Sequence, residues 1–193
     1  MRALLAMLLL LGLVAAGCGG STSTTVTRTV TTTRTVTSPS GGTTTGKAAS
    51  ACIGSQLAGK FTVVPGSAGA GQISYLLTLA NISSQACFVS GLPDAQLLDA
   101  SGNELPTNVQ PSHPGQATAA KVTLGPGEAA DAEARFSPDV PGTGDHTPGQ
   151  CQPTATMLRV TPGGSGTVDA SIQPPTSVCE QGTLRFELLS TKR

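Results

Sequence analysis

Only two imidazole side chains, His113 and His146, are available for acid–base chemistry in this chain of 193 residues. A hydrolytic site would need one of them within hydrogen-bond reach of a Ser or Cys nucleophile and of an orienting carboxylate. Both lie in segments rich in Pro and Gly, at 111–115 and 144–148, and no Gly-x-Ser-x-Gly motif occurs. We therefore expect solvent-exposed loop histidines and no enzymatic activity.

A metal site would draw on His113 and His146 together with Asp139 and Asp145. The two histidines are far apart in the chain and lack the His-x-His or His-x-x-Glu spacing that brings ligands onto one face of an element. Met157 is the only methionine beyond the apolar N-terminal run, which disfavours copper handling by thioethers. We expect neither a metal nor a cofactor.

Two carboxylates, Asp131 and Glu133, alternate with alanines and share a predicted strand face with Arg135. A pair of carboxylates that flanked a cleft could serve as the acid and base of a glycosidase. Charges at alternate positions of an exposed strand are more simply solvated and compensated by one another. We expect a solvated strand face here.

Sugar binding by stacking would need exposed aromatic rings, and the chain has one Tyr, four Phe and no Trp. Tyr75, Phe136 and Phe186 fall at the apolar positions of alternating segments, which predicts that they lie in the core. Only Phe61 and Phe88 are left. Too few rings therefore remain for a carbohydrate platform.

Beyond residue 50 the chain alternates apolar and polar residues, a pattern typical of half-buried strands. The clearest predicted strands are 72–79, 128–136, 167–172 and 184–188, and others are predicted near 60–64, 86–89, 95–99, 117–124 and 156–161. Turn signals rich in Gly separate them at 66–71, 125–127 and 162–166. Eight or nine strands predict an all-β, antiparallel β-sandwich with Greek-key connections over residues 51–193.

The N-terminus has the layout of a secretory signal that ends at a cysteine. Arg2 supplies a positive charge, an apolar run follows at 3–16, and small residues lead into Cys18. The run is shorter than the roughly 20 apolar residues of a spanning helix. It resembles a bacterial lipobox, which predicts a lipoprotein signal peptide at 1–17 and a lipid on Cys18.

A segment rich in Thr and Ser, residues 18–50, separates this signal from the predicted strands. Between residues 21 and 45 it contains 13 threonines and four serines. Thr and Val favour strands locally, so β-structure is the competing interpretation. Val26, Val30 and Val36 are too few apolar residues to offset the entropy of ordering the backbone, so we predict a disordered tether.

The formal charge of the chain is zero, but all 11 acidic residues lie beyond residue 50. The predicted domain is therefore acidic, and it lacks the clustered basic residues that nucleic-acid binding requires. We expect no nucleic-acid partner.

Four cysteines remain if Cys18 carries a lipid, namely Cys52, Cys87, Cys151 and Cys179. An even number in an exported domain predicts two disulfides, for which three pairings are possible. The absence of a Cys-x-x-Cys motif disfavours a zinc or thiol-redox site.

Several short motifs follow one another between Cys52 and residue 189. They are Leu-Thr-Leu-Ala-Asn-Ile-Ser at 77–83, Gly-Leu-Pro at 91–93, Val-Thr-Leu-Gly-Pro-Gly at 122–127, Leu-Arg-Val-Thr-Pro at 158–162 and Gly-Thr-Leu at 182–184. Together with the four cysteines, they resemble the exported actinobacterial domain of unknown function called DUF4232. The resemblance implies an immunoglobulin-like extracytoplasmic domain that is often lipid-anchored, and it implies no activity.

Of the three disulfide pairings, we favour Cys52–Cys87 and Cys151–Cys179, because each joins segments that are near in the chain. Each would contribute roughly 3–4 kcal/mol in the chain-entropy model.

The sequence thus predicts a cell-envelope lipoprotein held on the outer face of the membrane through Cys18, with one binding or interaction module. Apolar edges or loops are the expected contacts for an envelope protein or cell-wall polymer. They are expected to include 101–118 or 137–153, two long loops rich in Pro and Gly. The alternative is a passive structural component of the envelope without a specific ligand.

Overall fold

The computed structural model describes residues 48–115, 120–145 and 151–191. The predicted signal peptide at 1–17, the lipidation site Cys18, most of the tether and His146 lie outside the described residues. Within the described residues, no helix is long and apolar enough to cross a membrane.

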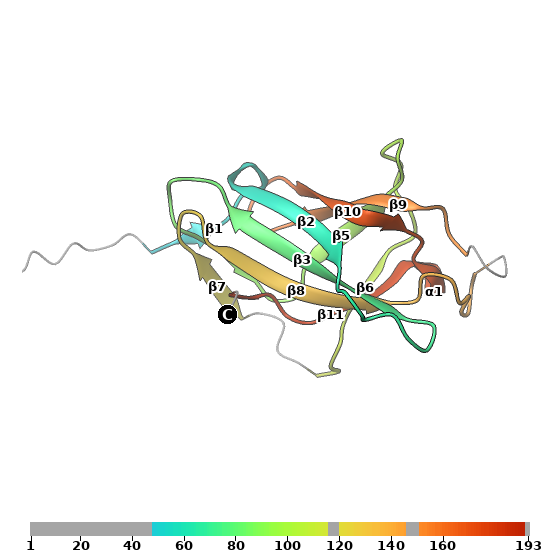
Figure 1. The fold of residues 1–193 in the computed structure, drawn as a ribbon. Coiled ribbons are helices and arrows are strands. Elements are labelled where there is room, and N and C mark those ends of the chain that lie inside the picture. The colour runs from blue at the N-terminus through green and yellow to red at the C-terminus, as the bar shows by residue number, and fades with distance from the viewer. Residues whose placement is uncertain (1–47, 116–119, 146–150, 192–193) are drawn as a thin grey trace, which may run out of the picture. The chain divides into compact units, whose positions relative to one another are not determined.

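The described domain is a β-sandwich of two sheets (Figure 1). In spatial order, the larger sheet contains β5 (Asp94–Leu98), β9 (Ala155–Thr161), β10 (Val168–Thr176), β2 (Leu57–Val63), β3 (Ile73–Asn81), β8 (Ala129–Phe136), β11 (Thr183–Phe186) and β6 (Asn108–Pro111), with β12 (Ser190–Thr191) also paired to β8. The smaller sheet contains β1 (Ser50–Ala51), β4 (Cys87–Ser90) and β7 (Lys121–Leu124). Two short helices complete it, η1 (Gly54–Gln56) and α1 (Cys179–Gly182). The predicted all-β sandwich is confirmed.

Each of the nine predicted strands corresponds to an observed strand, and the larger differences concern pairing. Most neighbours are antiparallel, but β1–β4, β10–β2 and β11–β6 pair in parallel. Alternation reports which face a side chain takes and not the direction of its neighbour, so the sequence could not reveal these pairs. β6 escaped prediction because Asn108, Gln110 and Pro111 leave Val109 as its only large apolar residue.

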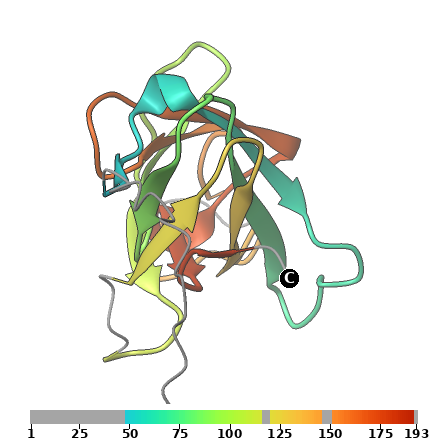
Figure 2. The same cartoon turned by 90° about the vertical axis from the view of Figure 1, so that its left-hand side faces the viewer.

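The core is built on the alternating apolar positions of both sheets. Phe61, Tyr75, Phe136 and Phe186 are fully buried and pack as one aromatic cluster, with ring centroids 5.2 to 6.5 Å apart. Viewed end-on, the strands surround this interior (Figure 2). The Tyr75 hydroxyl donates a hydrogen bond to the Pro174 carbonyl at 2.9 Å. Burial raises the pKa of this phenol.

The predicted core positions of Tyr75, Phe136 and Phe186 are thus confirmed. Phe88 is half-buried, and the Lys121 ammonium lies 4.4 Å from its ring centroid. None of the five aromatic rings of the chain, all of them in the described part, forms an open stacking platform.

Asn81 is a buried polar residue that joins β3 to the turn between β7 and β8. Its side-chain amide donates to the carbonyls of Gln85, Leu124 and Gly125 at 2.8, 3.1 and 3.2 Å. Its side-chain oxygen accepts from the backbone N–H and hydroxyl of Ser83. Because all these contacts are internal, Asn81 holds the end of the sandwich together.

The edge of β5 is covered by the chain that leads into β6. The Leu105 N–H donates to the Leu97 carbonyl at 2.9 Å, and the Leu97 N–H donates to the Thr107 hydroxyl at 2.9 Å. This segment also packs closely on Gly182, where a Cβ would lie 1.8 Å from the Pro106 oxygen. Covering an edge in this way protects it from pairing with another chain.

Candidate ligand-binding groove

A groove of about 340 Å³ lies over the solvent-facing side of β3, β8 and β11. Its lining residues are all polar or charged, and they carry charges of both signs. The lining residues are Ser74, Ser112, His113, Glu133, Arg135, Arg185 and Glu187. They come from β3, β8, β11 with the residue that follows it, and the loop after β6, so the sheet pairing decides which of them meet.

Strand register arranges the charges of the groove in two rows. Arg135 of β8 lies directly opposite Arg185 of β11, and Ser74 of β3 lies on the other side of Arg135. Two residues further along, the Glu187 N–H donates to the Glu133 carbonyl at 2.7 Å, which places these two glutamates side by side. We call these the arginine row (Ser74, Arg135, Arg185) and the glutamate row (Glu133, Glu187).

The arginine row is incompletely satisfied within the described residues. Arg185 donates to Glu180 at 3.1 Å, whereas the Arg135 guanidinium has no hydrogen bond or ion pair. Ser74 is only 7% exposed, and its hydroxyl has no hydrogen-bond partner in the described structure. Like charges directly opposite on neighbouring strands are destabilising. The fold therefore holds donors together that an anion would satisfy.

His113 lies at one side of the groove, with its side chain 72% exposed as predicted. Its Nδ1 is 3.0 Å from the Ser112 hydroxyl and 3.6 Å from a Glu187 carboxylate oxygen. Serine, histidine and glutamate therefore meet, but both contacts are made at the same ring nitrogen. A hydrolytic triad places the nucleophile and the acid on opposite nitrogens. This arrangement holds the imidazole beside a carboxylate without forming that relay.

The predicted strand face of Asp131, Glu133 and Arg135 is present, but its charges do not compensate one another as expected. Asp131 accepts a hydrogen bond from the Thr78 hydroxyl at 2.6 Å. Glu133 faces Glu187, and Arg135 faces Arg185. Glu133 and Arg135 therefore each lie beside a residue of the same charge, because strand pairing determines the nearest neighbours.

Sequence reasoning missed Ser74, Ser112, Arg185 and Glu187 as groove residues. Arg185 and Glu187 occupy the polar positions of the predicted strand 184–188, which is the available signal. Their meeting with β8 depends on the pairing of β11 with β8 and β6, which alternation does not specify.

A second, more open hollow of about 460 Å³ lies over β9 and the turn after β5. Its charged residues are paired: Arg159 Nε and a terminal nitrogen donate to the two Asp169 oxygens at 2.8 and 3.1 Å. Asp99 accepts from the Asn103 side chain and from the backbone of Asn103 and Ser101, and these bonds hold its pKa below the usual range. The charged groups of this hollow therefore already have hydrogen-bond partners within the chain, which makes it a weaker candidate for ligand binding.

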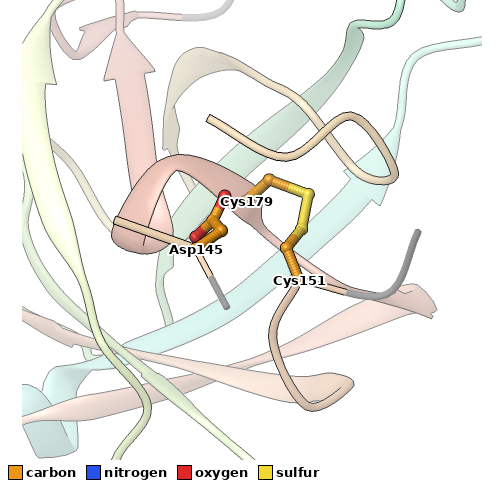
Figure 3. A group of neighbouring side chains, drawn as sticks. All are labelled: Asp145, Cys151 and Cys179. Carbon is orange, nitrogen blue, oxygen red and sulfur yellow. A yellow bond between two sulfur atoms is a disulfide. The ribbon is translucent and has the colours of Figure 1, made fainter. Parts of the chain in front are cut away.

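Asp145, Cys151 and Cys179 form the one group of at least three potential metal ligands found in the described residues (Figure 3). Cys151 and Cys179 are joined in a disulfide, so their sulfurs are committed to each other. Asp139 and His113, which the sequence suggested as partners of Asp145, are not in this group.

The Asp145 carboxylate closes the loop onto α1. It accepts backbone N–H bonds from Gly142 at 2.9 Å, Glu180 at 2.7 Å and Gln181 at 3.1 Å. Desolvation pushes its pKa up, but the N–H donors outweigh that effect and hold the pKa below its usual range. Glu180 and Gln181 have left-handed φ values of 54° and 57°, which aim their N–H groups at the carboxylate. We call Asp145 and these donors the Asp145 clasp.

The second disulfide joins Cys52 to Cys87 across the start of β4. The structure therefore contains the disulfide pairing that we favoured among the three possible ones, Cys52–Cys87 with Cys151–Cys179. Both bonds lie in or against the core, and all four cysteines are buried.

A family model described as "Domain of unknown function (DUF4232)" matches residues 52–188. The chain belongs to this family. The match runs from Cys52 in front of η1 to just beyond β11, so it spans both disulfides and the groove. No curated protein and no solved structure matches the chain.

The loops of the DUF4232 domain were expected to offer apolar contacts to a partner. The exposed large apolar side chains of the described residues are Ile53, Ile82 and Val140, and only Val140 lies in the expected loops. The charged groove, which includes Ser112 and His113 of the 101–118 loop, is the more distinctive surface.

Proposed function

We propose that this chain is an exported lipoprotein of an actinobacterial cell envelope whose DUF4232 domain is a non-catalytic binding module. A lipid on Cys18 anchors it to the outer face of the membrane, and the threonine-rich tether holds the domain away from the bilayer. Two disulfides in one domain support an oxidising, extracytoplasmic location. The apolar run before Cys18 supports the anchor.

The observation that carries the binding role is the unpaired arginine in a concave surface. Arg135 lies in a groove with convergent polar groups, next to Arg185 and a buried serine hydroxyl that has no partner among the described residues. Concave sites with a few converging polar groups are where proteins bind small ligands or chain ends. An envelope protein or cell-wall polymer that presents such a group is the partner we favour.

A passive structural role is the second candidate, and one observation favours it. The groove contains two arginines and two glutamates, so their charges cancel. A solvated face without a ligand would have this balance as well.

Crosslinking in cells separates the two roles. The tagged protein, crosslinked in its native host, should yield a reproducible envelope partner that is lost in Arg135→Gln and retained in Arg159→Gln. The same partners from wild type and Arg135→Gln, or none from either, would favour the passive role. Cys18→Ala should release a folded protein from the membrane fraction, and a membrane-bound Cys18→Ala protein would contradict the anchor.

A further inference from the structure

The charges of the groove follow a fixed order along the strands. The arginine row and the glutamate row are two residues apart along β8 and β11. Side chains on one face of a strand repeat every two residues, which is about 7 Å. The groove therefore presents a cationic and an anionic end at a molecular distance from each other.

The cationic end is built for an oxyanion. Arg135 has no partner in the described structure, Arg185 uses one nitrogen on Glu180, and the Ser74 hydroxyl is buried and unpartnered. Guanidinium groups bind carboxylates and phosphates through short, charge-assisted hydrogen bonds. A buried hydroxyl without a partner is costly, and an acceptor from a ligand would remove that cost.

The anionic end is built for an ammonium group. Glu133 is exposed and makes no side-chain hydrogen bond or ion pair to other described residues. Glu187 lies beside it, 3.6 Å from His113 Nδ1. Neighbouring carboxylates repel each other, and a cation between them would relieve that repulsion. The free arginine and the free glutamate stand at positions 135 and 133 of one strand without pairing to each other.

We propose that the groove binds a zwitterion whose oxyanion sits on the arginine row and whose primary ammonium sits between Glu133 and Glu187, about 7 Å away. This inference rests on the proposed binding function and adds the class of ligand to it. Two sources carry these charges: a free ω-amino acid, and a peptide that ends in lysine, in which the carboxylate and side-chain ammonium lie at a similar separation.

The test is an NMR titration of the full chain, purified with both disulfides intact. The probe is 6-aminohexanoate, compared with hexanoate, hexylamine and glycine, which lack one charge or hold the two too close together. We expect 6-aminohexanoate to shift the amides of residues 74, 133–135 and 185–187 in a saturable way. Each of the three comparison compounds should bind about tenfold more weakly, as expected for one lost charge-assisted contact.

Matched variants locate the site. Arg135→Gln and Glu133→Gln should each weaken binding of 6-aminohexanoate about tenfold, while Arg159→Gln leaves it unchanged. Equal binding of hexanoate, or shifts confined to residues outside the groove, would overturn the inference. A lysine-ended peptide that binds better than its amidated form would identify a chain end as the source. Binding of 6-aminohexanoate without binding of the peptide would identify a free ω-amino acid.

Failure of this titration is distinguishable from failure of the binding function. If no zwitterion binds but a partner is still captured in cells through Arg135, the ligand class is wrong and the binding module stands.

Discussion

Two arginines of the larger sheet, each in a different hollow, have opposite environments. Arg159 of β9 donates two hydrogen bonds to Asp169 on the neighbouring strand β10. Arg135 of β8 meets Arg185 on its neighbouring strand and has no acceptor in the described structure. Both are charged residues on exposed strand faces, yet one is satisfied within the fold and the other is left open.

Polar groups whose partners lie within the chain contribute to the fold itself. Asn81, the Asp145 clasp and the Arg159–Asp169 pair have their acceptors and donors within the chain. The Ser74 hydroxyl and the Arg135 guanidinium have no such partner among the residues that the structure describes. In the part of the chain that the structure describes, these three groups are satisfied while two neighbouring donors are left open, and this contrast is the basis of the proposed ligand site.

The largest effect is expected from the satisfied group that is most deeply buried. Asn81→Ala removes the donor to three carbonyls and the acceptor for Ser83. It should lower the free energy of unfolding by about 3 kcal/mol, since buried acceptors are left unpaired. Urea denaturation measures this, with exposed Ser84→Ala as the matched control. Equal urea midpoints for the two variants would show that the Asn81 side chain does not stabilise the fold.

A smaller loss is expected at the Asp145 clasp. Asp145→Asn weakens three hydrogen bonds to a charged acceptor and should destabilise the domain by about 1 to 2 kcal/mol at pH 7. The folded pKa of Asp145 is lowered. Its contribution is therefore fully present above the unfolded value near 3.9 and is lost as the pH falls through the folded pKa.

The gap in stability between wild type and Asp145→Asn should accordingly narrow below about pH 4. Urea midpoints at several pH values check this, with Asp139→Asn, an exposed carboxylate in the same loop, as the control. A gap that stayed constant with pH would mean that the charge of Asp145 does not stabilise the clasp.

Arg159→Gln is expected to have a still smaller effect. Its ion pair with Asp169 is half-exposed, and exposed pairs of this kind contribute little to stability. The denaturation midpoint should fall slightly in low salt and match wild type in high salt, because screening removes the contribution of the pair. A loss that persists in high salt would assign the effect to packing of the side chain.

The sequence predicted the parts of this fold that depend on local pattern. Alternation located nine strands and placed Tyr75, Phe136 and Phe186 in the core, where they are buried. The groove could not be predicted from the sequence, because it depends on pairing between strands that are distant in the chain. That Glu187 would lie beside Glu133, and Ser112 and His113 beside Glu187, follows from β11 sitting between β8 and β6. Nothing local to any of these segments specifies that order.

The most direct test of the account is a side-by-side measurement of Arg135→Gln and Arg159→Gln. For each variant, the free energy of unfolding and the affinity for 6-aminohexanoate are determined in the same buffer. Arg135→Gln should unfold within about 0.5 kcal/mol of wild type, or be slightly more stable because a like-charge pair is removed, and should lose most of its binding. Arg159→Gln should bind as wild type does. Undiminished binding by Arg135→Gln would contradict the claim that the groove is a ligand site.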